Sequence, residues 1–134
     1  MATILAHITI KAGEAAHFEA LAREMYSATH QHETAVRHYE YWRGEQPNTY
    51  YALLAFDDFH GFIAHQTSPH HESASGDLRS VIEAMRLEWV DPIAGASPLP
   101  PTAHQAPAEG AGDLEVRYSS MFAAHVAEWW ATQR

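Results

Sequence analysis

The first part of the chain shows two hydrophobic periods in succession. In residues 3–10 apolar side chains fall at every second position, the period of a strand with one buried face. The next segment instead repeats apolar side chains every three or four positions, at Phe18, Leu21 and Met25, as in a helix with one buried stripe. These patterns predict a strand followed by a helix of about 15 residues.

A pair of strands is predicted next. Residues 35–43 and 49–56 are rich in β-branched and aromatic side chains, which favour strands. Between them, Gly44, Pro47 and Asn48 favour a turn. The two segments are therefore predicted to pair as a hairpin.

A second helical region and a fourth strand complete this part of the chain. Asp57 and Asp58 favour the start of a short helix, which Pro69 is expected to end. Residues 75–92 are predicted to form one or two helical turns that lead into a strand at residues 85–90. The resulting order βαββαβ is that of the ferredoxin-like fold, an α+β arrangement with two helices on one face of a four-stranded antiparallel sheet.

The other face of this sheet carries tryptophan, tyrosine and leucine side chains. Such a face is unfavourable in water, so we expect two copies to pack their sheets together as a dimeric α+β barrel. The ferredoxin-like domain is assigned to residues 1–92.

The remainder of the chain has a different composition. Residues 93–112 are rich in proline, alanine and glycine and are predicted to be an extended linker. Residues 113–134 form a C-terminal extension, in which DLEVRY is predicted to be a short strand and an amphipathic helix follows. That helix carries Trp129 and Trp130 in its apolar stripe, expected to pack on the protein itself or across the dimer, or to dock another protein.

Charge and composition narrow the function. The formal net charge is −9, and Lys11 is the single lysine, so phosphate backbones and anionic lipids are repelled. We therefore expect no nucleic-acid partner, and no segment has the roughly 18 apolar residues of a membrane span. The absence of cysteine excludes thiolate chemistry and fits a reducing compartment, so a cytoplasmic location is predicted.

Histidines are concentrated in HQTSPHHE, residues 65–72, and the chain has 11 of them. His65 and His70 are five residues apart, about 140° around a helix, so they can meet at one metal ion only if the chain folds back. We therefore predict no metal site. A single imidazole in a pocket suffices as an acid or base, and His65, at the edge of an apolar stripe, is the best placed, although a solvated or structural role remains the alternative.

Residues 56–72, FDDFHGFIAHQTSPHHE, resemble the corresponding segment of the antibiotic biosynthesis monooxygenase family of small dimeric α/β-barrel proteins. Members typically show an acidic helix start, an aromatic residue, then Ala-His, followed three residues later by Ser-Pro-His or Thr-Pro-His. The resemblance extends over residues 3–92 and leaves the linker and the extension outside. The positions that meet the pattern are Asp57, Phe62, Ala64, His65, Ser68, Pro69 and His70.

The resemblance implies a homodimer that oxidises a small aromatic, phenolic or quinol substrate with O₂ and needs no cofactor. An electron-rich phenolate can itself pass an electron to O₂, so the protein need only deprotonate it and exclude water. His65 or His70 is then the base, whereas Tyr51 and Trp42 serve as pocket walls unless they merely pack. The candidate residues are His65, His70 and Tyr51 for catalysis and Trp42, Arg86 and His7 for substrate binding.

Similar proteins have other activities, which depend on residues at the matching positions. Heme-degrading relatives use an Asn, a Trp and a His where this chain has His7, His65 and Ser75, so heme breakdown is not expected. Polyketide cyclases of this type use a histidine and a tyrosine for proton transfer, and the sequence does not separate cyclisation from oxygenation. A dimer that binds a small ligand without catalysis is the third alternative.

Overall fold

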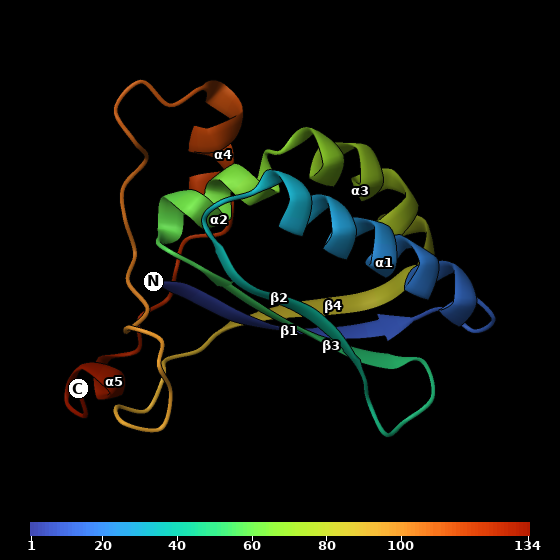
Figure 1. The fold of residues 1–134 in the computed structure, drawn as a ribbon, viewed down its shortest axis with the longest axis horizontal. Helices are drawn as coiled ribbons and strands as arrows, with labels where there is room; N and C mark the ends of the chain where they lie inside the picture. The colour runs from blue at the N-terminus through green and yellow to red at the C-terminus, as the bar shows by residue number, and fades with distance from the viewer.

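Helices cover one face of a four-stranded antiparallel sheet in the computed structural model of the chain, which describes residues 1–134 (Figure 1). The strands are β1 (Ala2–Ile10), β2 (Val36–Arg43), β3 (Thr49–Phe56) and β4 (Ile82–Trp89). The helices are α1 (Ala15–His32), α2 (Phe59–Gln66), α3 (Pro69–Val81), α4 (Asp113–Met121) and α5 (Glu128–Ala131).

The strand order is β2-β3-β1-β4, with β1 and β3 in the middle of the sheet. All neighbouring strands are antiparallel, and α1, α2 and α3 lie on the same side of them (Figure 1). The predicted ferredoxin-like α+β fold is therefore confirmed. No helix is both long and apolar enough to span a membrane.

The core lies between the sheet and the helices. The inward residues of β1 are buried, as their alternation predicted, and they include Ile4, Ile8 and Ile10. From α1, Phe18 and Met25 are almost completely buried in the same cluster. Burial of such side chains supplies most of the driving force for this packing, at about 2 kcal/mol each.

The break between α2 and α3 differs from the prediction. Pro69 does not only end one helix but opens the next, because the first helical position needs no backbone N–H donor. The Ser68 hydroxyl caps α3 by accepting a hydrogen bond from the His71 amide. As a result α3 is longer than predicted, and β4 begins at Ile82.

The C-terminal extension also differs. Residues 113–118 are helical, so the predicted strand was wrong; Glu115 accepts a hydrogen bond from the Gly112 amide at 2.8 Å and thereby caps α4. The last helix is limited to the four residues of α5. The chain passes around the end of the sheet, with α4 on the helical side and α5 near the opposite side (Figure 1).

The segment before α4 is attached to the domain rather than free of it. Thr102 is buried, and its hydroxyl donates a hydrogen bond to the Val90 carbonyl at 2.6 Å. Farther along, the Gln105 side-chain oxygen accepts a hydrogen bond from the Phe59 amide at the start of α2. These contacts position α4 over α2.

Candidate active site

A cavity of about 720 Å³ lies between the inner face of the sheet and the helices α2, α3 and α4. Its floor includes Ala6 and Ala52, which are directly opposite each other on β1 and β3. Two short side chains at paired positions leave room above the sheet that larger residues would fill. The volume is in the range that encloses a small organic ligand.

His65 is the predicted site residue that lines this cavity. It lies in the last turn of α2 and is only 1% exposed, with its Nδ1 atom 2.8 Å from Oε1 of Glu33. Glu33 directly follows α1, so the dyad joins the ends of two helices. A carboxylate at Nδ1 favours the tautomer with a proton there, which leaves the Nε2 lone pair free to accept a proton.

His70 contacts the same carboxylate but is not part of the cavity lining. Its Nε2 atom lies 2.8 Å from Oε1 of Glu33 and 3.3 Å from the hydroxyls of Thr29 and Ser68. Among the two predicted bases, the structure therefore places His65, and not His70, at the cavity wall.

Glu33, His65 and His70 could hold a metal ion, because one ligand atom of each lies within 4.8 Å of the other two. The sequence allowed the two histidines to meet only if the chain folds back, and the chain does turn between α2 and α3. The hydrogen bond from His65 and the contacts of His70 account for this approach without an ion. We interpret the group as a triad in which one carboxylate orients two imidazoles.

His71 lines the cavity too, although sequence reasoning had not selected it. Its ring centroid is 4.9 Å from that of His65. Burial, together with the nearby His65, lowers the pKa of His71 to about 4, so this imidazole is neutral at pH 7. Its Nδ1 atom is buried and has no hydrogen-bond partner in the protein.

Two tyrosines from β2 extend the polar part of the wall. The hydroxyls of Tyr39 and Tyr41 are 2.9 Å apart, and the Tyr39 ring centroid lies 4.9 Å from that of His65. Burial raises the pKa of Tyr39 well above its ordinary value and also raises the pKa of Tyr41. Both side chains therefore remain protonated near neutral pH.

The extension closes one side of the cavity. Tyr118, in the middle of α4, donates a hydrogen bond from its hydroxyl to Oε1 of Glu72 at 2.7 Å. The ring of Phe122 packs edge-on against Phe62 of α2, with the centroids 6.0 Å apart. The sequence suggested no such role for α4, because residues 113–118 were interpreted as a strand.

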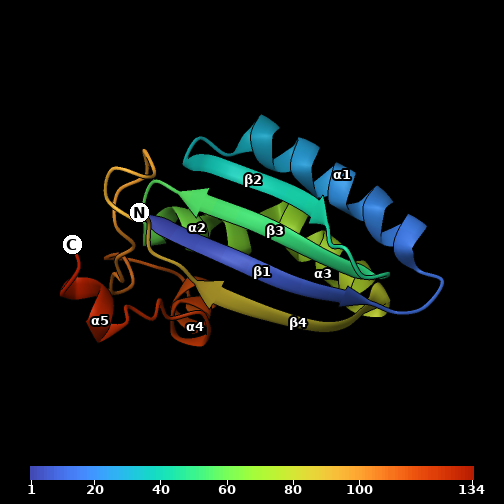
Figure 2. The same cartoon turned by 90° about the horizontal axis from the view of Figure 1, so that it is seen from below.

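The other four predicted site residues lie on the opposite face of the sheet. They form one row across four strands, because Trp42 pairs with Tyr51, Tyr51 with His7, and His7 with Arg86. Figure 2 views the sheet from this uncovered side. The sheet thus separates these residues from His65, and the structure does not bring the six candidates together.

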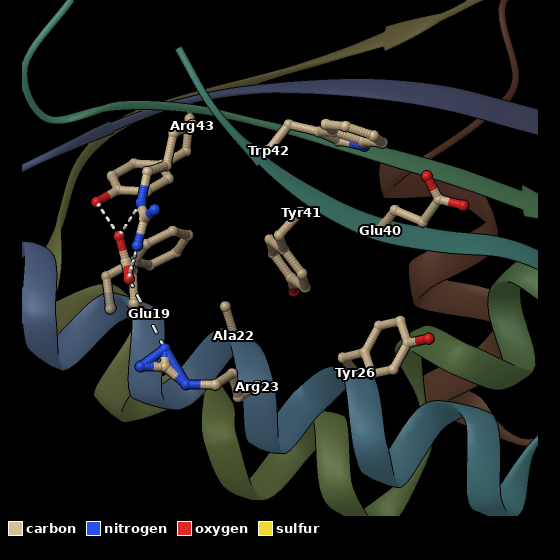
Figure 3. Close-up of a pocket in the computed structure, with 10 residues that line it drawn as sticks. Glu19, Ala22, Arg23, Tyr26, Glu40, Tyr41, Trp42 and Arg43 are labelled. Carbon is tan, nitrogen blue, oxygen red and sulfur yellow. Dashed lines mark hydrogen bonds and ion pairs between the residues drawn. The ribbon is translucent and has the colours of Figure 1, made fainter.

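A second hollow, of about 600 Å³, lies between α1 and β2 (Figure 3). Tyr41 points into it, and the predicted site residue Trp42, which extends toward the other side of β2, is also part of its lining (Figure 3). At one end, Arg43 donates two hydrogen bonds of 2.7 Å to Glu19, which lowers the pKa of Glu19 to about 2. Its charged residues are paired and no histidine lines it, so it lacks a free acid or base.

Comparisons with known proteins agree with this architecture. The sequence profile of the antibiotic biosynthesis monooxygenase family matches residues 1–76, more than half of the chain. The chain belongs to this family. The match covers β1 to the middle of α3, whereas α4 and α5 lie beyond it. No curated protein matches the sequence.

Several solved structures have the same fold. A candidate antibiotic biosynthesis monooxygenase from Bacteroides thetaiotaomicron superposes with a TM-score of 0.67 at 16% identity, covering 73% of this chain and 94% of that one. One from Caulobacter crescentus has a TM-score of 0.65 at 16% identity, covering 69% and 89%. A Pseudomonas aeruginosa protein has a TM-score of 0.64 at 18% identity, covering 69% and 94%. At these identities the likeness establishes the fold alone.

Proposed function

We propose that this protein is a cofactor-independent monooxygenase that oxidises a small phenolic or quinol substrate with O₂. The observation that carries the proposal is the Glu33–His65 dyad at the wall of a cavity lined largely by apolar side chains. Deprotonation of a phenol requires a base whose free lone pair is held in a fixed orientation, in a pocket that excludes water. Membership of the antibiotic biosynthesis monooxygenase family supports the same reaction type.

The reaction begins when Nε2 of His65 removes the proton of the substrate hydroxyl, and Glu33 stabilises the imidazolium that results. The phenolate then transfers one electron to O₂, and the radical pair combines to form a C–O bond in a substrate hydroperoxide. The hydroperoxide then loses water to give the oxidised product. One oxygen atom enters the product, the other leaves as water with two substrate hydrogens, and the substrate supplies all the electrons.

His71 and the tyrosine pair fit this scheme as polar groups that stay uncharged. The imidazole of His71 is neutral, so it does not form an ion pair with the phenolate. The protonated hydroxyl of Tyr39 can donate a hydrogen bond to an oxygen of the substrate. The same groups would also serve proton transfer in a cyclase or isomerase. Oxygen dependence therefore separates the two activities.

The proposal is tested by O₂ uptake with a panel of hydroquinones and anthrones. His65→Ala should lower the rate at least about 100-fold, because a positioned general base contributes roughly that much. The matched control is His17→Gln, which changes an exposed histidine on α1 and should leave the rate unchanged.

No uptake above buffer with any member of the panel would contradict the oxygenase. If product instead forms without O₂ and is lost in His65→Ala, the activity is proton chemistry. If no substrate is changed although ligands bind, the protein is a binding dimer.

We also propose that the functional unit is a homodimer formed through the uncovered face of the sheet. This face presents Trp42, which is 59% exposed, beside Tyr51. An exposed aromatic pair on a sheet face that no helix covers is typical of a surface that a partner covers. In this arrangement the predicted residues of that face stabilise the dimer rather than line the cavity.

A further inference from the structure

The arginines of the cavity differ from all the others in the chain. Among the seven arginines, five have a carboxylate oxygen within 4.0 Å of a guanidinium nitrogen. The two without such a partner, Arg79 and Arg117, are the two that line the cavity. The paired arginines are Arg23, Arg37, Arg43, Arg86 and Arg134.

The local contacts of these two side chains leave most of their N–H groups free. Arg79 makes two long contacts of 3.4 Å to Ser75, one to its carbonyl and one to its hydroxyl. The guanidinium of Arg117 lies over the ring of Tyr118, 5.3 Å from its centroid. Both arginines are exposed, so they stand at the mouth of the cavity rather than at its floor.

Two carboxylates also line the cavity, and neither neutralises these cations. Glu72 already accepts the hydrogen bond from the Tyr118 hydroxyl, and Glu83 forms no ion pair. The protein has a formal net charge of −9, so acidic partners for arginine are abundant. The two arginines that line this cavity nevertheless have none. They form the kind of site that binds a carboxylate through charge-assisted hydrogen bonds.

The dimensions suit an aromatic acid. Arg79 follows His71 by eight residues of the same helix, which corresponds to about 12 Å along its axis. A bicyclic aromatic molecule with a hydroxyl at one end and a carboxylate at the other can therefore place its hydroxyl near His65 while its carboxylate reaches the mouth. Apolar side chains of the sheet and of α3 line the space between.

We propose that the substrate is an aromatic molecule that carries a carboxylate, which Arg79 and Arg117 bind at the mouth of the cavity. This inference rests on the proposed function for the position of the hydroxyl. Arg117 belongs to α4, beyond the residues that match the family, so the extension supplies part of the specificity.

The test compares two probes of the same shape, 6-hydroxy-2-naphthoate and its uncharged amide, 6-hydroxy-2-naphthamide. Their affinities are measured by calorimetry without O₂ at pH 7.5, so that no turnover interferes. The acid should bind about tenfold more tightly than the amide. In Arg79→Gln and Arg117→Gln that preference should shrink at least threefold while the affinity for the amide stays unchanged. Arg23→Gln, an exposed arginine outside the cavity, is the matched control.

Equal affinities for acid and amide, no binding of the acid at millimolar concentration, or a preference that survives in both variants would overturn the proposal. The readout does not depend on turnover. A protein that prefers the acid but consumes no O₂ retains the carboxylate site and loses the oxygenase. A protein that oxidises uncharged quinols without preferring the acid retains the oxygenase and loses the site.

Discussion

At the scale of single residues, His71 shows how burial changes the chemistry of an imidazole. Its pKa falls to about 4, first because burial disfavours the charged form and second because His65 lies close by. His70 acts in the same direction, whereas Glu72 and Glu33 oppose the shift. The unfolded chain, by contrast, binds a proton at an ordinary histidine pKa of about 6.5.

This difference predicts a loss of stability in acid. As the pH falls from about 6.5 to 4, the unfolded state takes up a proton that folded His71 does not, so the free energy of unfolding decreases. The size of the shift corresponds to roughly 3 kcal/mol over that window. We expect His71→Gln to lose about that much less stability than the wild type between pH 7.5 and pH 4, as measured by urea denaturation.

The control for this comparison is His17→Gln, because His17 is exposed. It should show the same pH dependence as the wild type. An identical loss of stability in His71→Gln and in the wild type would show that His71 titrates normally in the folded protein.

The sequence placed His65 at the edge of a helical stripe, which depends only on local periodicity, and the structure has His65 in the last turn of α2 at the cavity wall. Its partner Glu33 could not be predicted, since their contact joins residues 32 apart through the packing of two helix ends. For the candidate site residues on the strands, the sequence did not indicate the face of the sheet on which each lies. Tyr50 and Tyr51 are adjacent aromatics, as are Tyr41 and Trp42, so the pattern did not indicate which of each pair faces the helices.

At the scale of secondary-structure elements, α4 depends on a small number of contacts with the domain. The hydrogen bond from Tyr118 to Glu72 joins α4 to α3, and residues of α4 also contact α2. A carboxylate acceptor makes this bond stronger than a neutral one. The helix lies over the cavity, so its attachment controls how completely the substrate is enclosed.

Tyr118→Phe should therefore loosen α4 selectively. Loss of a hydrogen bond to a carboxylate, about 1.5 kcal/mol, should increase amide hydrogen exchange in α4 about tenfold and leave the strands unaffected. Tyr26→Phe is the control, because Tyr26 is exposed and its hydroxyl has no hydrogen-bond partner in the protein. Unchanged exchange in α4 would mean that the apolar contacts of Phe122 hold the helix without Tyr118.

Sequence periodicity predicted β1 and α1 well, because each carries one clear apolar repeat. It was less successful where two elements share a boundary. Pro69 serves both α2 and α3, and α4 is too short for its apolar positions to repeat more than twice. Capping by Ser68 and Glu115 decides these boundaries, and such caps act through single hydrogen bonds.

At the scale of the whole molecule, the uncovered sheet face predicts a dimer. Size-exclusion chromatography with light scattering should give twice the 15.0 kDa of one chain. Trp42→Glu places a carboxylate on the proposed interface, where burial of an unpaired charge costs several kcal/mol, and should shift the protein to the monomer at micromolar concentration.

The extension offers a matched control that also tests the alternative interface. Trp129 is 68% exposed, as available to a partner as Trp42, but it lies on α5 and not on the sheet. Trp129→Glu should leave the dimer intact if the sheets form the contact. Dissociation by Trp129→Glu alone would instead place the interface on the extension, and a single 15.0 kDa species at every concentration of the wild type would rule out the dimer. In that last case the row from Trp42 to Arg86 faces solvent and requires another explanation.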